Sequence, residues 1–324
     1  MRRFIARADA AGKGGHRAAA SRTGGRSNEQ VVQAARALVP SQPRACRLKA
    51  RMRVGRQLLY AAALSAIGLG VRSVAKGPVP LSVAAGATVG FSAIVLAGVL
   101  EPRLAMFADV VNRGAPSADR ARVALTFDDG PSERSTPEIL AQLDEAGVHA
   151  TFFAIGRKLV GARATLLREA VARGHGVGCH SFAHDRLFAM RGEARVREDL
   201  RRALSTIEDA VGVRTRLFRP PIGHTNPTIA RVARELSLTI VGFSVRGYDG
   251  FGSARADAVA RRIVAGLSDG AIALLHDGAE RDDFPPVAPR ALPAILDAMR
   301  TRGLAGVTVD ELLAEPPRPV ALRA

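Results

Sequence analysis

The chain has 324 residues, of which 47% are hydrophobic, so it can bury a sizeable core and is not disordered throughout. Its net charge is +17, and residues 1–56 alone hold 14 Lys or Arg against Asp9 and Glu29. Only Cys46 and Cys179 are present, which excludes a disulfide framework and a thiolate metal site.

Residues 1–56 predict a basic, disordered arm that faces the cytoplasm. Such an arm can attract anionic lipid or nucleic acid. It contains one aromatic residue, Phe4, and we expect no nucleic-acid binding. Because Met52 begins a shorter frame with a more ordinary N-terminus, it stays open whether residues 1–51 belong to the native protein.

A strongly apolar region follows at 57–103. Residues 58–71 are uncharged, Arg72 and Lys76 interrupt the run, and residues 77–100 contain no charge. A membrane-spanning helix needs about 20 such residues, so we predict one or two transmembrane helices, in the inner membrane of a bacterium. A cleaved signal peptide and a buried hairpin of soluble helices are the alternatives. One crossing would place the following domain outside and two would return it to the cytoplasm, so its side is left open.

From 120 to 315 short apolar runs alternate with amphipathic segments, and 316–324 form a tail. The apolar runs predict strands at 123–127, 150–155, 177–179, 217–218, 239–245, 271–275 and 306–309. The amphipathic segments predict helices at 136–146, 159–173, 193–211, 227–236, 256–267 and 289–302. Repeated units of this size imply an α/β fold with a parallel sheet, and about seven strands favour a closed or nearly closed barrel.

Polar residues follow five of the predicted strands, where barrel enzymes carry their chemistry. They are Asp128 and Asp129 in "TFDDGP", His180 and His184 in "HSFAH", Arg219 in "RPPIG", Asp249, and His276 in "LLHD". Each alone is unremarkable, since Asp-Gly-Pro is ordinary turn chemistry and a single histidine is more often structural. Their gathering at one end of one barrel indicates an active site.

The residue types permit metal-assisted hydrolysis of an amide. His180 and His184 are four residues apart, so on a helical turn both imidazoles would face one ion. Two histidines and a carboxylate suit Zn²⁺ or another divalent transition metal. One of Asp128 and Asp129 would bind the metal, and the other would be free as a base. His276 could then protonate an amine leaving group.

These motifs, in this order over roughly 190 residues, resemble those of the polysaccharide deacetylases, the NodB-homology domain of carbohydrate esterase family 4. The resemblance implies a distorted (β/α)7 barrel that removes N-acetyl groups from N-acetylhexosamine units with a divalent metal, for which we expect Zn²⁺. It implies roles for ten residues. Asp128 would be the base, oriented by Arg219, and the metal ligands would be Asp129, His180 and His184. His276 would be the acid with Asp249 as its partner, and the substrate would contact Pro220, Ile222 and Leu274.

Three positions depart from the family pattern. Ile222 stands where the family commonly has Tyr, and in "SVRGYDG" Arg246 replaces an expected Asp and Gly250 an expected Trp. The loss of that aromatic wall disfavours a long soluble glycan such as chitin. Together with the apolar region, Arg246 favours an anionic or lipid-linked glycan, although a solvated or structurally paired arginine is the plainer interpretation.

Other functions remain open at the level of the sequence. The same metal site would serve a deformylase or a cyclic-imide hydrolase, and a non-catalytic glycan-binding scaffold could keep the fold. We expect an N-acetylated glycan or lipid-linked amino sugar as substrate, membrane lipid around the apolar region, and no obligate protein partner.

Overall fold

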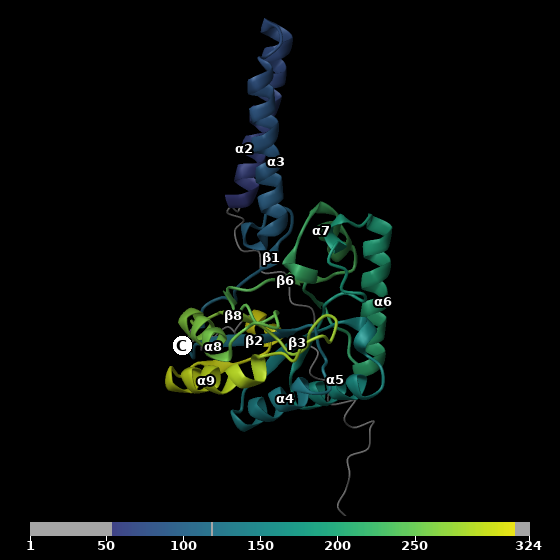
Figure 1. Ribbon diagram of the computed structural model, residues 1–324, viewed down its shortest axis with the longest axis vertical. Helices are drawn as coiled ribbons and strands as arrows, with labels where there is room; N and C mark the ends of the chain where they lie inside the picture. Colours follow the sequence, from purple (N-terminus) through teal and green to yellow (C-terminus); the bar gives the residue numbers. More distant parts are fainter. Residues whose placement is uncertain (1–53, 118, 315–324) are drawn as a thin grey trace, which may run out of the picture.

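The computed structural model describes residues 54–117 and 119–314, which form a helical hairpin and an α/β domain (Figure 1). The hairpin consists of α2 (Val54–Lys76) and α3 (Leu81–Leu100). The strands are β1 (Val110–Val111), β2 (Arg122–Asp128), β3 (Ala150–Ala154), β4 (Gly176–Cys179), β5 (Leu217–Phe218), β6 (Thr239–Val241), β7 (Val245–Arg246), β8 (Ile272–His276) and β9 (Ala305–Gly306). The predicted tail and nearly all of the predicted arm lie outside the described residues.

Helices alternate with these strands along the chain. The α-helices of the domain are α4 (Ser135–Glu145), α5 (Ala162–Ala172), α6 (Glu193–Val211), α7 (Pro227–Glu235), α8 (Ala256–Gly266), α9 (Ala288–Thr301) and α10 (Val309–Leu313). Four short 3₁₀ turns are η1 (Pro102–Leu104), η2 (Gly156–Lys158), η3 (Phe188–Met190) and η4 (Pro221–Gly223). The six helices predicted from amphipathic segments therefore all form, and α10 is an addition.

The sheet is parallel and curls into a barrel. Its strand order is β1-β6-β5-β4-β3-β2-β8-β7, with β9 paired to β2. Among strands β2 to β8 the two edges are β6 and β7, yet only residues 242–244 connect them, so the edges must lie close together. Residues 110–113 lie between these two edges, because β1 pairs with β6 and Arg113 forms a β-bridge with Ala271 next to β8. The predicted distorted seven-stranded barrel is confirmed.

Two predicted strands differ in the structure. The single strand predicted at 239–245 was wrong: β6 and β7 are separate, because the carbonyl oxygens of Val241 and Gly242 accept hydrogen bonds from Arg219. The strand predicted at 306–309 ends at Gly306, and α10 follows. Thr308 begins α10 with a capping box, in which its hydroxyl accepts from the Glu311 backbone and its own N–H donates to the Glu311 carboxylate.

The pleat of β2 sorts its side chains between two environments, because successive residues of a strand face opposite sides. Val123, Leu125 and Phe127 pack in the large cluster beneath the surrounding helices. Ala124 belongs to a smaller cluster with Phe153, Leu217, Val241, Ile272, Val309 and Leu312, which includes residues of α10. The same alternation places Thr126 and Asp128 on the same inner face as Ala124, nearer the carboxyl end of the strand than this smaller cluster.

The hairpin of α2 and α3 stands away from the domain (Figure 1). Both helices are long and apolar enough to cross a membrane, and almost nothing of either is buried. Their domain-side ends pack tightly on residues 104–106: a Cβ at Gly55 would meet the Leu104 carbonyl, and one at Gly98 would meet the Met106 sulfur. The hairpin is thus not a pair of helices inside a soluble core.

Candidate active site

The register of the strands brings the predicted polar residues to one mouth of the barrel. Asp128 and His276 lie opposite each other in the pairing of β2 with β8, and each ends its strand. The strands β4 and β5 end at paired residues, so His180 and Arg219, which follow them, leave the sheet together. Parallel strands all present their carboxyl ends to the same face, and the mouth collects these four side chains.

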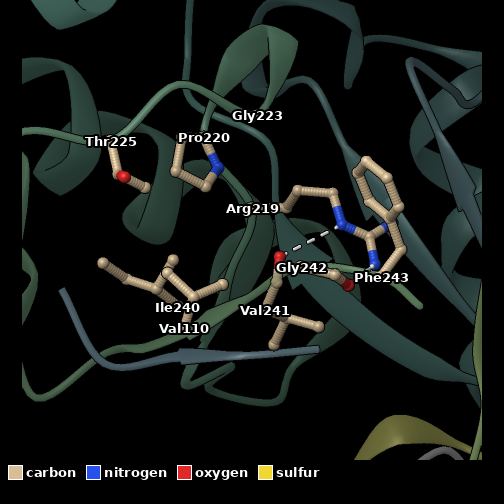
Figure 2. A pocket seen from close by; sticks show the side chains of 9 residues that line it. All are labelled: Val110, Arg219, Pro220, Gly223, Thr225, Ile240, Val241, Gly242 and Phe243. Atoms are coloured by element: carbon tan, nitrogen blue, oxygen red, sulfur yellow. Dashed lines mark hydrogen bonds between the residues drawn. The ribbon is translucent and has the colours of Figure 1, made fainter. Parts of the chain in front are cut away.

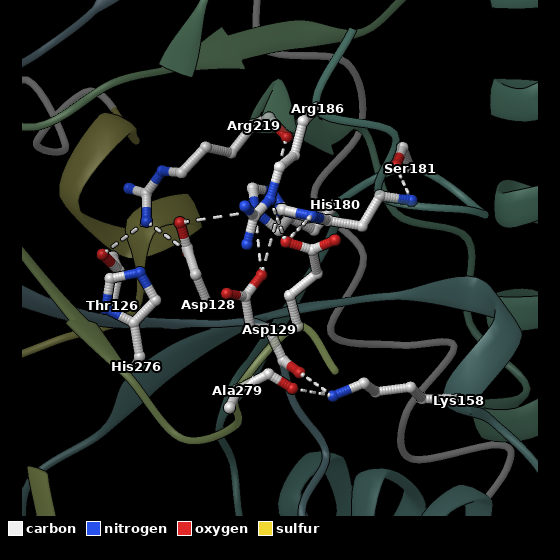
Figure 3. A network of polar contacts seen from close by, with 12 residues as sticks. Thr126, Asp128, Asp129, Lys158, His180, Ser181, Arg186, Arg219, His276 and Ala279 are labelled. Carbon is white, nitrogen blue, oxygen red and sulfur yellow. Dashed lines mark hydrogen bonds and ion pairs between the residues drawn. The ribbon is translucent and has the colours of Figure 1, made fainter. Parts of the chain in front are cut away.

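Asp128 is buried and is held by Arg219, which is only 2% exposed. Nη1 of Arg219 donates to Asp128 Oδ1 at 2.7 Å and to Thr126 Oγ1 at 2.8 Å (Figure 3). Its Nε and Nη2 donate to the carbonyl oxygens of Val241 and Gly242 at 3.2 and 2.9 Å (Figure 2). Because buried charges need partners, the arginine and the carboxylate fix each other's orientation.

Asp129, His180 and His184 form a buried group whose ligand atoms all lie within 4.8 Å of one another. Nε2 of His180 and of His184 are 3.4 and 3.2 Å from Asp129 Oδ1. That oxygen is buried and has no hydrogen-bond partner among the described residues. A carboxylate and two imidazoles are a common donor set for Zn²⁺, and the three residues fit a divalent metal ion.

The electrostatics of this group favour a cation. Burial by itself would raise the pKa of Asp129, but contact with His180 and the charges of the nearby histidines hold that pKa well below its usual range. Burial disfavours a charge on His180, but Asp128 and Asp129 raise its pKa overall. Burial, helped by the charge of His180, lowers the pKa of His184 to about 4, so His184 is the neutral form that binds metals.

The backbone around the histidines selects the metal-binding nitrogen. Nδ1 of His180 lies 2.7 Å from the carbonyl oxygen of Arg219, which can only accept, so Nδ1–H donates, and in the neutral imidazole the lone pair is on Nε2, which faces Asp129. The assumed helical turn for "HSFAH" was wrong, because this loop is irregular and Ser181 and His184 have φ of 65° and 49°. The imidazoles still approach, with ring centroids 4.8 Å apart.

His276 and Asp249 form the second pair at the mouth. His276 Nδ1 lies 3.0 Å from Asp249 Oδ1, and the His276 backbone N–H donates to Oδ2 at 2.8 Å. Burial opposes the charged imidazole, but Asp249 outweighs it and raises the pKa of His276 to about 9. A Cβ at Gly250 would lie 3.1 Å from Cε1 and Nε2 of His276, so this glycine leaves room for the ring.

The three residues expected at the substrate lie in different settings. Ile222 is 46% exposed, whereas Leu274 is buried in β8. Pro220 lines a narrow cavity of about 10 Å³ between Arg219 and the strands β1 and β6 (Figure 2). Of the three, Ile222 alone presents a side chain to solvent.

Strained backbone concentrates at this mouth. Positive φ angles occur at Asp129, Ser181, His184, Ile222 and Tyr248, all on the loops that follow the strands. Each such residue costs on the order of 1–3 kcal/mol and persists only where its surroundings hold it. The loops are therefore fixed by contacts beyond the residues named so far.

Lys158, which the sequence did not single out, supplies one of those contacts. It is 3% exposed, and its Nζ donates to the carbonyl oxygens of Asp129 and Ala279 (Figure 3). The same Nζ donates to Asp282 Oδ1 at 2.8 Å. The lysine thus ties the loop of Asp129 to the loop that follows β8. In "AIGRKL" it has the pattern of an ordinary surface residue, and only its burial reveals the role.

Asp277 was also missed, although it is the last residue of "LLHD". It is 1% exposed, and its Oδ2 accepts from the Thr136 hydroxyl at 2.6 Å. Burial raises its pKa to about 7. A Cβ at Gly130 would lie 2.1 Å from that oxygen, so the glycine of "DDGP" is required by the buried acid.

We expect Lys158→Met to weaken metal binding by about 10- to 100-fold, the usual effect of losing a group that orients a ligand. Asp129 would lose the hydrogen bond that anchors its backbone. Titration of the metal-free protein with Zn²⁺ measures this. Arg163→Met is the matched control, because Arg163 also pairs with Asp282 but contacts neither carbonyl. Equal affinity in the two variants would contradict the expectation.

Known proteins match the same region. A sequence profile described as polysaccharide deacetylase matches residues 115–241. The peptidoglycan-N-acetylglucosamine deacetylase PgdA of Listeria monocytogenes is 34% identical over 194 residues, which are 60% of this chain and 39% of that protein. This chain therefore matches only about two fifths of that relative's length. A chitooligosaccharide deacetylase of Sinorhizobium fredii is 34% identical, with 59% of this chain and 88% of the relative covered.

Solved structures share the fold. The family 4 carbohydrate esterase of Streptomyces lividans superposes with a TM-score of 0.52 at 32% identity, covering 59% of this chain and 93% of that one. A family 4 acetyl xylan esterase from Clostridium thermocellum, described with a cobalt ion, gives a TM-score of 0.53 at 31% identity, covering 59% and 89%. With the barrel, the five motifs and these relatives together, the chain belongs to the polysaccharide deacetylase family.

Proposed function

We propose that the domain is a metal-dependent N-deacetylase that hydrolyses the N-acetyl amide of an amino sugar in a glycan or a lipid-linked sugar. One observation carries the proposal: three groups of residues share one mouth. They are the metal-binding set of Asp129, His180 and His184, the buried ion pair of Asp128 and Arg219, and the pair of half-buried His276 with buried Asp249. Relatives named deacetylases of peptidoglycan N-acetylglucosamine and of chitooligosaccharides support it.

Asp129, His180 and His184 would hold the metal, for which their donor set favours Zn²⁺. When bound, the ion supplies a Lewis acid for the acetyl carbonyl oxygen and for the attacking water. Asp128 accepts the proton of that water. Because Arg219 occupies Oδ1 of Asp128, Oδ2 remains for the proton transfer, and it lies 3.8 Å from His180 Nε2 at the metal group.

His276 donates the proton that the leaving amine takes up. Its Nδ1 is held by Asp249, so Nε2–H is left to protonate the amine as the C–N bond breaks and acetate forms. The backbone N–H of Ile222 would donate to the developing oxyanion. Pro220, Ile222 and Leu274 would line the pocket for the acetyl group and the sugar.

Acetate release tests the proposal. The purified full chain should release acetate from members of a panel of N-acetylated glycans and lipid-linked amino sugars, lose this activity with a chelator and regain it with Zn²⁺. Acetylated xylan and N-formylated sugars belong in the panel, because a relative is an acetyl xylan esterase and formate would indicate a deformylase. The proposal fails if no N-acetylated compound releases acetate.

We expect Asp249→Asn to move the alkaline limb of the rate profile to lower pH. The acid form of His276 is active below its pKa, and Asp249 raises that pKa to about 9. Without the carboxylate the imidazole loses its proton at lower pH, so turnover falls earlier as the pH rises. Rates of acetate release from pH 6 to 10 measure the limb. An unchanged limb would remove Asp249 from this role.

We further propose that α2 and α3 cross a membrane as a hairpin. α3 has 20 residues and so a length of about 30 Å, the thickness of a bilayer core. The domain-side end of α2 is anchored by Arg56, which pairs with Asp109 at 2.9 Å. Two crossings would therefore put the basic arm and the domain on one side, the cytoplasmic one, because basic segments stay inside.

Cysteine accessibility tests this topology. Cysteines placed at Lys76 and at Arg120 should react with an impermeant reagent from opposite sides of the membrane. Lys76 ends α2 and would lie at the far tip, whereas Arg120 belongs to the domain. Labelling of both positions from the same side, or release of the full chain by a carbonate wash, would contradict the hairpin.

A further inference from the structure

We propose that Arg246 and Arg262, whose guanidinium groups both lie near the ring of Tyr248, form an anion subsite that binds the phosphate of a lipid-linked amino sugar. The inference deepens the proposed function and rests on it for the identity of the sugar. The phosphate contact itself can be measured without any hydrolysis.

Three arginines and two aromatic rings alternate beside the mouth. The guanidinium of Arg103 lies 5.6 Å from the centroid of Phe243, and that of Arg246 lies 5.7 Å from the same centroid. Arg246 is also 4.7 Å from the centroid of Tyr248, and Arg262 is 5.6 Å from it. Each ring therefore contacts two positive groups, which repel each other and together attract an anion.

These arginines lack acidic partners among the described residues. Arg262 Nη1 donates to the Gly247 carbonyl and Arg103 Nη2 to the Ser244 carbonyl, each at 3.2 Å. The Nε of Arg246 is buried and has no hydrogen-bond partner. By contrast Arg261, next to Arg262 on α8, pairs with Asp257 at 2.9 Å. Since a guanidinium carries five donors, this set has donors to spare for a phosphate.

A depression of about 240 Å³ adjoins these arginines and rings. It is lined by Tyr248, Phe251, Ser253, Ala254, Arg255, Ala258 and Arg262. It lies on the loop that carries Asp249. The next residue of that loop, Gly250, is close enough to His276 that a Cβ would be 3.1 Å from the ring. An anion held in this depression is thus a neighbour of the reacting sugar.

The position of the set favours a lipid phosphate over a free one. Arg103 lies three residues beyond the end of α3, where the chain would leave the bilayer, and basic residues at that level attract lipid phosphates. The Thr225 N–H donates to the Val99 carbonyl of α3 at 3.2 Å, so the loop of Ile222 also meets the hairpin base. Tyr248 and Phe251 are 52% and 60% exposed, as suits side chains at headgroup level.

Binding of decyl phosphate to the full chain in dodecyl maltoside micelles tests the subsite. ³¹P NMR measures this binding, and the chain carries Asp128→Asn so that no turnover occurs. We expect the ³¹P resonance of decyl phosphate to broaden saturably as protein is added. Arg246→Gln and Arg262→Gln should each weaken this binding by about 10- to 100-fold, as for loss of a charge-assisted hydrogen bond. The affinity of Arg246→Lys for decyl phosphate should lie between those of the parent and Arg246→Gln, since an ammonium keeps the charge without the bidentate geometry.

The controls separate the possible sources of the anion. Arg261→Gln, on the same helix, should bind decyl phosphate like the parent, and circular dichroism establishes that each variant is folded. Inorganic phosphate should bind far more weakly than decyl phosphate. Equal affinity for the two would overturn the lipid source, and unchanged affinity in folded Arg246→Gln and Arg262→Gln would overturn the subsite. If acetate release fails while decyl phosphate binds in this pattern, the subsite stands and the proposed reaction falls.

Discussion

Asp128→Asn should keep its metal and lose about 10²- to 10⁴-fold in kcat, the usual range for losing a general base. Asp129→Asn should instead lose the metal, because a neutral amide is a poorer ligand for a divalent ion. The structure gives the reason for this difference between adjacent residues. Asp128 still belongs to β2 and faces Arg219, whereas Asp129 turns at a φ of 68° toward His180 and His184.

Metal analysis and turnover on both purified variants make the test. KM should change little in Asp128→Asn, since the loss falls on the transition state. The melting temperature must be recorded as well, because asparagine leaves Arg219 without its carboxylate. The division of roles is wrong if both variants lose metal equally, or if Asp128→Asn retains full activity.

Arg219→Met should destabilise the fold by about 3–5 kcal/mol, the cost of leaving one member of a buried ion pair without its partner. Arg219 and Asp128 are both nearly inaccessible, and their nitrogen and oxygen are 2.7 Å apart. The double variant with Asp128→Asn should lose less than the two single variants together, because it removes both charges. Urea unfolding of the three variants measures these free energies.

Arg261→Met is the matched control for this prediction. Its pair with Asp257 lies on the exposed face of α8, so its removal should change stability little. Were Arg219→Met to unfold at the same urea concentration as Arg261→Met, Arg219 would not be the internal support of the barrel mouth.

The order of strands and helices could be read from the sequence because hydrophobic periodicity follows from local geometry. The strands around Phe127, Phe152 and Leu275 are continuous apolar runs, as expected for a sheet covered on both faces. The break between β6 and β7 could not be read, because it depends on Arg219, which is some twenty residues away and takes the carbonyl oxygens of Val241 and Gly242.

For the site, the sequence was enough to show which reactive groups follow which strands. The Asp128–Asp129 pair, the two histidines of "HSFAH" and His276 are each ordinary alone, but all of them come directly after strands whose ends meet at one mouth. The residues that hold these groups in place became visible only in the folded chain. Lys158 and Asp277 are side chains that usually lie on surfaces, and here both are buried. Their roles depend on contacts between loops far apart in the chain, and local patterns in a sequence carry no record of such contacts.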